Sequence, residues 1–235
     1  MFPGMFIRSI GFHGRIAPAV LCAGILLTLT AVSSFSQEAR VTYLLGDATV
    51  TRGDDTFSAR IGTALEQRDV VRTGPSATMI IQLSQQSELK LRADTTVRMS
   101  SIASDPEVRL DSGGLFARVA ERLRGRFEVR TPSVVAGVRG TQFFVAYGRT
   151  IEEKPDLWLC VNDGRVQVSV RETGQSRIVR EGEGINILAS SRLTDPQFYQ
   201  WTTRLNWNMD PDEGSVEDDT SLDEAYSDLL DQDYD

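Results

Sequence analysis

Histidine and cysteine, the residues that supply imidazole and thiol groups for catalysis, are rare in this chain. Its one histidine is His13, and its two cysteines are Cys22 and Cys160. A histidine-activated nucleophile, or a zinc site of histidine and cysteine, needs more of these residues than residues 37–235 contain, and one thiol forms no internal disulfide. Acid-base chemistry would therefore have to use carboxylates.

Paired carboxylates are the remaining route to catalysis, because glycosidases place two of them across the bond that is cleaved. Nothing in the sequence pairs two acids of the body, which lie in turn-like or alternating contexts; examples are Glu66, Asp69, Glu88, Asp94 and Glu128. We therefore expect a protein that is not an enzyme and that needs neither a metal nor a cofactor.

The net charge of −8 comes from the C-terminal end of the chain and not from its body. Residues 210–235 contain twelve acids and no base, whereas residues 1–36 contain two arginines and no acid. Subtracting both from 25 bases and 33 acids leaves 23 bases and 21 acids in residues 37–209. A body this close to neutral lacks the basic footprint of a nucleic-acid-binding protein, so we expect no nucleic acid partner.

Residues 1–36 have the order of a secretory signal peptide. Arg8 and Arg15 precede or border an apolar run over residues 16–32, and small residues lead to a cleavage position before Gln37. An uncleaved anchor helix is the alternative, since the run is at the lower limit of about 17–25 residues for a membrane span. We expect cleavage, a mature protein with no stable membrane insertion, and an extracytoplasmic, periplasmic location.

Residues 37–190 predict a single all-β domain. Apolar residues recur with period two in short runs between Gly, Asp or Pro, and strands of this length fit a β-solenoid-like fold or a β-roll. Both faces of residues 157–162 are apolar, which is typical of a central strand and makes Cys160 a buried small hydrophobe rather than a reactive thiol. The turn at residues 162–164 predicts a tight hairpin to residues 165–170.

A helix is predicted within residues 191–209, where Asp195 and Pro196 can begin it. Three candidate docking residues, Phe198, Trp201 and Leu205, would share one face of this helix. We expect that face to pack on the open end of the β domain and cover its edge. An exposed aromatic surface that docks a partner is the alternative.

Residues 210–235 are acidic and low in apolar residues, so we expect a disordered tail. Within it, Ser221 and Glu224 have the spacing of a capping box, which predicts a short amphipathic helix. Its apolar stripe supplies the other candidate docking residues, which are Leu222, Tyr226, Leu229 and Leu230. This helix could fold onto a partner or onto the body, and a merely solubilising tail is the alternative.

The most distinctive motif lies between two predicted strands and consists of Thr131, Pro132, Gly137, Val138, Arg139, Gly140 and Thr141. It resembles the FecR domain family, and supporting matches extend the resemblance over about residues 41–190. From the residues alone, the glycines permit unusual backbone angles or close approaches. Arg139 offers five donors that could tie together turn carbonyls or a nearby carboxylate, and binding an acidic partner is its alternative role.

The resemblance implies a non-catalytic binding or scaffold protein that engages an envelope protein or a cell-wall glycan. In the regulators of iron-uptake signalling that belong to the family it resembles, a cytoplasmic anti-sigma segment and a membrane helix precede the domain. Here about 36 residues precede the body. The chain therefore looks like a secreted stand-alone FecR domain. A periplasmic signalling component that relays the envelope state to a separate membrane regulator is the alternative, and no oligomeric state is predicted.

Overall fold

The computed structural model describes residues 39–84, 87–102, 105–121, 126–150 and 154–225, all within the unit Phe35–Asp235. The predicted signal peptide lies outside the described residues, as do Tyr226, Leu229 and Leu230 of the predicted C-terminal helix. Within the described ranges, no helix is long and apolar enough to cross a membrane.

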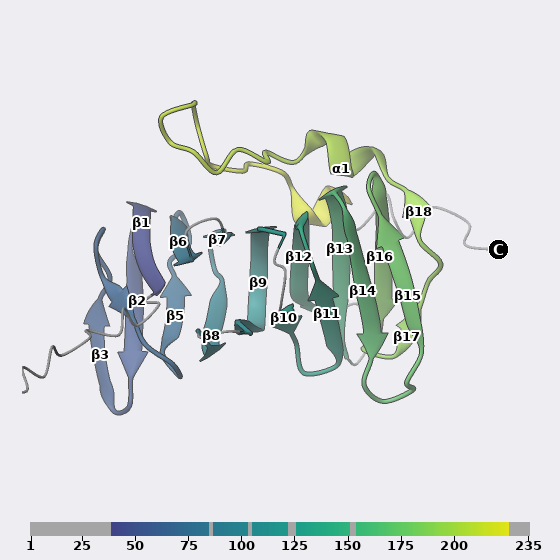
Figure 1. Ribbon diagram of the computed structural model, residues 1–235, viewed down its shortest axis with the longest axis horizontal. Helices are drawn as coiled ribbons and strands as arrows, with labels where there is room; N and C mark the ends of the chain where they lie inside the picture. Colours follow the sequence, from purple (N-terminus) through teal and green to yellow (C-terminus); the bar gives the residue numbers. More distant parts are fainter. Residues whose placement is uncertain (1–38, 85–86, 103–104, 122–125, 151–153, 226–235) are drawn as a thin grey trace, which may run out of the picture. The chain divides into compact units, whose positions relative to one another are not determined.

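Strands make up most of the described chain and confirm the all-β prediction (Figure 1). They form two layers, which share the long strand β9 (Glu107–Val119). Layer A contains, in spatial order, β4 (Ala64–Leu65), β1 (Ala39–Leu45), β6 (Thr78–Ser84), β7 (Ser87–Leu91), β9, β12 (Thr141–Thr150), β13 (Pro155–Asp163) and β16 (Glu183–Leu188), with β17 (Arg192–Leu193) and β18 (Gln197–Phe198) beside β16. Layer B contains β3 (Asp55–Ser58), β2 (Ala48–Arg52), β5 (Val70–Thr73), β8 (Thr96–Ser101), β9, β10 (Phe127–Arg130), β11 (Val134–Val138), β14 (Arg165–Val170) and β15 (Ser176–Arg180).

β9 joins the layers because its two halves pair with different neighbours. Residues 107–112 pair with β8 and β10, and residues 113–119 pair with β7 and β12. The change of layer falls at Gly113, whose φ of +92° suits glycine and where a Cβ would collide with Thr95. Of the strand pairs in the described part, β9 and β10 form the one parallel pair, and the arrangement is open. The stacked repeats typical of a β-solenoid are not shown.

Alternation along the strands divides the apolar side chains between two clusters. Inward-facing residues of both layers form the core between them. A second cluster lies on the outer face of layer A, where Phe116, Phe144 and Trp158 come from three neighbouring strands. The ring centroids of Phe116 and Phe144 are 4.6 Å apart, and those of Phe144 and Trp158 are 5.4 Å apart. Layer A is therefore apolar on both faces, and its outer face needs a cover.

The two-faced alternation predicted for residues 157–162 is confirmed. Leu157, Leu159 and Val161 belong to the core between the layers, and Trp158 and Cys160 belong to the outer cluster. Burial raises the pKa of the Cys160 thiol to about 12. The thiol therefore stays protonated at ordinary pH and behaves as a small hydrophobe.

The hairpin predicted at residues 162–164 is wrong. β13 pairs with β12 and β16 in layer A, whereas β14 pairs with β11 and β15 in layer B. The turn thus carries the chain from one layer to the other. Gly164 has a φ of +82°, and a Cβ there would lie 2.5 Å from the carbonyl oxygen of Gly140. The crossing turn therefore packs against the turn that follows β11.

The predicted C-terminal helix lies within the expected residues, but it is shorter than expected and packs on a different surface of the β domain. Helix α1 covers only Gln200–Arg204, because Gln197 and Phe198 pair with β16 as β18. Trp201 and Leu205 are buried in the outer cluster of layer A. The helix therefore covers a sheet face rather than an open end of the domain.

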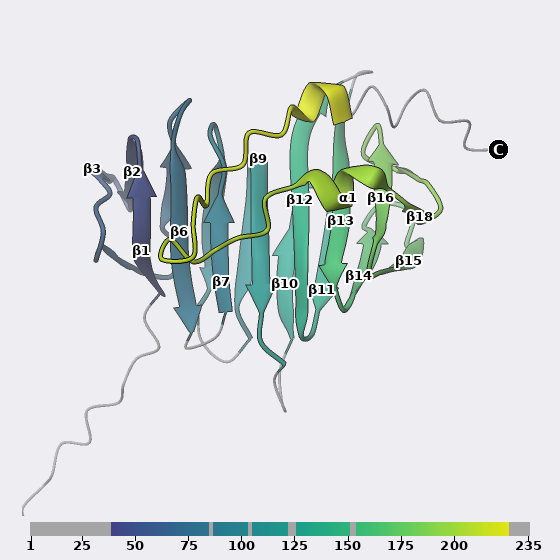
Figure 2. The ribbon, with the colours of Figure 1, turned by 90° about the horizontal axis from the view of Figure 1, so that it is seen from above.

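The chain beyond α1 corrects the expectation of a disordered tail for residues 210–225. We call residues 206–225 the strap, which runs out over layer A and then turns back (Figures 1 and 2). Met209, Val216 and Ala225 are buried in spite of the acidic residues around them. Asn206 joins the two legs, since its main-chain N donates to Asp218 Oδ1 at 2.9 Å and its Nδ2 donates to the Glu217 carbonyl at 2.7 Å. Packing and polar anchors, rather than regular hydrogen bonding, hold this segment.

The capping interaction predicted at the end of the strap is confirmed in part. The Ser221 hydroxyl oxygen accepts a hydrogen bond from the main-chain N of Glu224 at 3.2 Å, and residues 222–225 are helical. Leu222 packs against the outer cluster of layer A. The other half of the predicted apolar stripe lies outside the described residues.

A side chain at Gly164, in the turn that crosses between the layers, should destabilise the protein through a steric collision in addition to backbone strain. Gly174 has a φ of +70°, but nothing lies within 4 Å of a Cβ placed there. Gly174→Ala therefore measures the backbone strain alone, and Gly164→Ala adds the collision with Gly140. We expect Gly164→Ala to lower the free energy of unfolding by about 2 kcal/mol more than Gly174→Ala, measured by urea denaturation. Equal losses for the two variants would show that the crossing turn is not tightly packed.

Candidate functional site

The outer face of layer B is rich in arginine. Arg98, Arg109 and Arg130 are in register on β8, β9 and β10, so they form one row across neighbouring strands. On each strand, the residues next to the arginine in the chain face the core. Like charges directly opposite each other destabilise a sheet, so such a row needs carboxylates nearby.

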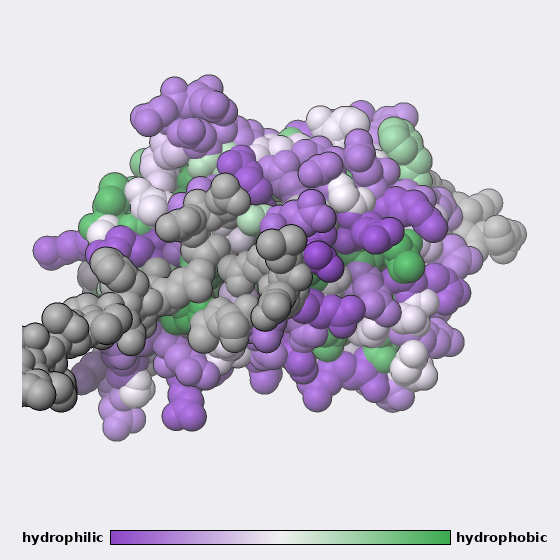
Figure 3. Space-filling model, in the orientation of Figure 1, coloured by the Kyte–Doolittle hydropathy of each residue, from purple (hydrophilic) through white to green (hydrophobic). Residues whose placement is uncertain are grey.

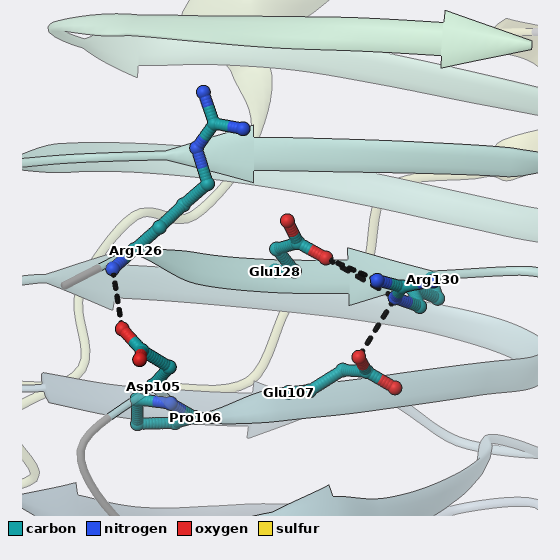
Figure 4. A pocket seen from close by; sticks show the side chains of 6 residues that line it. All are labelled: Asp105, Pro106, Glu107, Arg126, Glu128 and Arg130. Carbon is teal, nitrogen blue, oxygen red and sulfur yellow. Dashed lines mark hydrogen bonds and ion pairs between the residues drawn. The ribbon is translucent and has the colours of Figure 1, made fainter.

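Carboxylates of β9 and β10 neutralise one end of this row (Figure 4). Arg130 Nε lies 2.8 Å from Oε2 of Glu107, and Arg130 Nη2 donates to Oε2 of Glu128 at 2.7 Å. Glu107 and Glu128 are opposite each other in the parallel pair, which sequence patterns gave no means of predicting. Because Arg130 binds both carboxylates, they form a structural ion-pair network rather than a catalytic pair held apart for a substrate.

The ion pairs of Arg130 border a hollow of about 450 Å³, which Arg126 also lines. Arg126 lines a second, larger hollow as well and so connects the two. Its main-chain N donates to Asp105 Oδ1 at 2.9 Å, while its guanidinium points away from Asp105 (Figure 4). The side chain instead lies over Gly137 of β11, and Nη2 donates to Gln167 Oε1 of β14 at 3.2 Å. The absence of a side chain at Gly137 leaves the space that Arg126 fills.

The larger hollow, of about 710 Å³, is the candidate site, and we call it the arginine groove. Residues that define its charge and shape are Glu121, Arg126, Arg139, Arg165, Gln167 and Ile178. They come from the turn after β11, from β14 and β15, and from the segments that flank β10. The groove therefore surrounds the motif that the sequence singled out.

Thr141, and not Arg139, ties the motif turn together. The Thr141 hydroxyl is within hydrogen-bond distance of two carbonyl oxygens, at 3.3 Å from Arg139 O and 3.0 Å from Arg165 O. Thr131 has a similar role at the preceding turn, where its hydroxyl oxygen accepts from the main-chain N of Val134 at 3.0 Å. Pro132 is exposed beside it. The structure thus assigns the two threonines of the motif to turn formation.

Arg139 is left available for a ligand. Among the residues that the structure describes, the guanidinium groups of Arg139 and Arg165 form no hydrogen bond and no ion pair. Both residues are exposed, and both line the arginine groove. With Arg126 they give three cations against the single carboxylate of Glu121. A guanidinium is a planar fork that stays charged and binds carboxylates or phosphates through two parallel hydrogen bonds, so the groove suits an anion.

Apolar side chains are few among the described residues that can be seen in Figure 3. There the described residues are mostly hydrophilic, and their hydrophobic side chains are scattered. Ile178 is 48% exposed inside the groove, and Phe198 is 70% exposed on β18. Of the predicted docking residues, Trp201 and Leu205 are covered by contacts within the chain, so only Phe198 is freely exposed among those described.

A buried lysine on the opposite layer was missed by the sequence analysis. Lys90 is 0% exposed, and its Nζ donates to the main-chain carbonyls of Asn206 and Asn208 at 2.6 and 2.8 Å. The same Nζ lies 4.2 Å from the centroid of the Phe116 ring. Composition held a clue, since the chain has only two lysines, Lys90 and Lys154, among its 25 basic residues. The ammonium is a compact charge with three donors, and here it bonds two carbonyls of the strap at once.

Arg92 is the second cation that anchors the strap. Its Nη2 donates to the main-chain carbonyl of Thr220 at 2.7 Å, and its Nε lies 3.3 Å from Oδ2 of Asp218. The two cations of β7 and its end thus hold both legs of the strap. They hold the strap that covers layer A, and they do not line the arginine groove.

Comparisons with known proteins place the motif within a family. The model of the FecR protein family matches residues 69–173. Two crystal structures of a candidate anti-sigma factor from Parabacteroides distasonis ATCC 8503 are similar. The first, at 1.65 Å resolution, has 20% identity and a TM-score of 0.47, and the match covers 55% of this chain and 59% of that one. The second, at 2.50 Å, has 17% identity and a TM-score of 0.48, and the match covers 68% and 89%. No curated protein matches the sequence.

Lys90 predicts a distinctive dependence of stability on pH. Burial lowers the pKa of Lys90 from 10.5 to about 8, and the neighbouring Arg92 and Arg118 also lower it while Asp218 opposes them. Between these two pKa values the unfolded chain binds a proton that the folded chain lacks, so raising the pH favours the folded state.

We therefore expect the free energy of unfolding of the wild type to rise relative to that of Lys90→Met as the pH increases from about 8 toward 10.5. Chemical denaturation of both proteins at a series of pH values measures this difference, and the comparison removes the contribution of every other group. A constant difference across that range would contradict the lowered pKa.

Proposed function

Because residues 69–173 form a FecR domain, we propose that this protein is a non-catalytic, extracytoplasmic binding module that holds an acidic segment of an envelope protein in the arginine groove. The observation that carries this proposal is that the guanidinium groups of Arg139 and Arg165, at the family motif, form no hydrogen bond or ion pair with any residue that the structure describes. Strand pairing fixes the backbone from which they extend, since Arg165 lies on β14 and Arg139 directly follows β11.

The lining of the groove favours a protein segment over a glycan. Clusters of arginine are a recurring means of recognising acidic or phosphorylated segments. None of the described residues that line the groove is aromatic, so it offers no flat apolar platform for a sugar ring. Ile178 adds an exposed aliphatic contact for a side chain next to an acidic residue.

The described lining residues of the groove include no pair of groups for acid-base or nucleophilic catalysis. Its one carboxylate, Glu121, has no second acid, histidine or thiol beside it among the described lining residues. Within the described chain, no cluster of His, Cys, Asp and Glu could hold a metal ion. The arrangement provides positive charge and hydrogen-bond donors, which are the requirements of binding.

The binding proposal predicts that charge at the groove, and not charge on layer B in general, determines capture of the partner. Arg139→Ala with Arg165→Ala removes the two unpaired cations. Arg72→Ala with Arg98→Ala is the matched control, since both residues are exposed on the same layer outside the groove. We expect affinity for the partner in envelope extract to fall at least about tenfold in the groove variant, given roughly 1.5–3 kcal/mol for a hydrogen bond to a charged group, and to stay unchanged in the control.

A photoreactive residue at Ile178 identifies the segment that occupies the groove, with a second at Phe57 as the control site. Cross-linked peptides rich in Asp and Glu, lost in the groove variant, would support the proposal. Retention on isolated cell wall, without a protein cross-link, would replace the protein partner with a glycan. Equal capture by both double variants would show that the groove is not the binding site.

Export is a separate prediction, motivated by the charge order and small-residue exit of residues 1–36. Protein isolated from its native envelope should begin at or within a few residues of Gln37. Mass spectrometry of the N-terminal peptide measures this directly. Recovery of an intact Met1 in the membrane fraction would favour an uncleaved anchor instead.

A further inference from the structure

The C-terminal segment is separable from the core of the domain. Among the described residues, the last buried member of the core between the layers is Ile187, and Leu193 alone touches this core from the segment that follows. Tyr199, Trp201, Leu205 and Ala225 instead pack in the outer cluster on layer A. Residues 191–225 can therefore leave layer A while the core between the layers keeps its packing.

The contacts that hold this segment do not depend on its covalent connection to the same body. Lys90 and Arg92 donate mainly to its main-chain carbonyls, and Gln142 Nε2 donates to the carbonyl of Trp207 at 2.9 Å. A second copy of this chain offers the same carbonyls in the same order. It is thus an occupant that fits the outer face of layer A by construction.

The turn that leads into the segment is strained. Ala189 and Ser190 have φ values of +48° and +63°, and they form the turn between β16 and β17. Ser191 N donates to the carbonyl of Leu188 at 3.1 Å, which closes this turn. Two successive left-handed residues suit Asn-Gly, whereas a Cβ on both residues makes the conformation unfavourable. Extending this turn would relieve both residues at once.

We propose that residues 191–225 exchange between two copies of this chain. The turn at Ala189 and Ser190 opens, and the segment of each copy covers layer A of the other. The exchanged dimer keeps the packing of the segment on layer A and its contacts with Lys90, Arg92 and Gln142. It gives up the hydrogen bonds that close the two turns, such as that from Ala189 N to Asp156 Oδ1, in return for the loss of their strain. Association makes it dependent on concentration. The two arginine grooves of such a dimer would be linked, although the exchange does not rest on what they bind.

The experiment alters the strain of the turn and leaves the segment and the groove unchanged. Replacing Ser190 also removes its hydrogen bond to the Pro155 carbonyl at 2.8 Å, a loss that favours opening and so acts against the result expected for the Asn-Gly variant. Ala189→Asn with Ser190→Gly makes the closed turn favourable, and we expect dimerisation to weaken by roughly tenfold or more. Ala189→Val with Ser190→Val makes it less favourable, and the dimer fraction should rise. Arg68→Gly with Asp94→Gly is the matched control, because it relieves two left-handed residues outside the segment and should leave dimerisation unchanged.

Mass measured by analytical ultracentrifugation, from dilute to concentrated full-length protein, gives the dimerisation constant. A photoreactive residue at Trp207, whose ring lies 5.3 Å from that of Phe116, reports which copy supplies the cover. In mixtures of ¹⁴N and ¹⁵N chains, cross-links between unlike isotopes in the dimer, responding to the turn variants as stated, support the exchange.

Three results would overturn it. One is a dimer whose cross-links join only like isotopes, since another surface would then hold it. A second is an equal effect of the Asn-Gly and control variants. The third is a monomer at every concentration, both for the wild type and for a Val variant whose circular dichroism shows that it is folded. If the Val variant fails to fold, the wild type and the Asn-Gly variant still decide between the outcomes.

Discussion

The apolar outer face of layer A imposes the main constraint on this protein. Phe116, Phe144 and Trp158 lie on the side of the sheet away from the core, and each would cost about 1.5–3 kcal/mol if it were left in water. The chain covers them with α1 and the strap. Because the strap has little regular structure, ordering it costs conformational entropy that packing and polar anchors must offset. The polar anchors Lys90, Arg92 and Asn206 are placed where they limit that freedom.

Layer B meets water directly, and the contrast between the two outer faces divides stability from binding. Alternation gives both layers one face for the common core. The other face of layer A is consumed by the C-terminal segment, whereas that of layer B carries arginines across most of its strands. Ion pairs such as Arg130 with Glu107 and Glu128 use some of these charges. Arg139 and Arg165, which form no ion pair with a described residue, lie at the family motif.

Local patterns predicted the strand content, the two faces of residues 157–162 and the position of the motif. They could not predict which strands pair, because period two states where a side chain points and not which neighbour a strand meets. The crossing at Gly164 and the Glu107–Glu128 pair both follow from pairing. The strap was hidden by its acidic composition, since its apolar anchors Met209, Val216 and Ala225 are too widely spaced to form a pattern. Arg139 was assigned a bonding task at the turn that the small hydroxyl of Thr141 performs.

The strong preference for arginine over lysine has a consequence for how the groove would respond to its surroundings. All three cations of the groove are arginines, and a guanidinium keeps its proton from strongly acidic to strongly alkaline solution. The cations of the groove therefore stay charged, and a loss of attraction in acid must come from the molecule that enters it. A carboxylate ligand would be released by acid when it becomes neutral, whereas a phosphate monoester would keep one charge and stay. Release in acid would thus depend on the chemistry of the ligand, and the same groove could hold some partners and lose others as the medium became acidic.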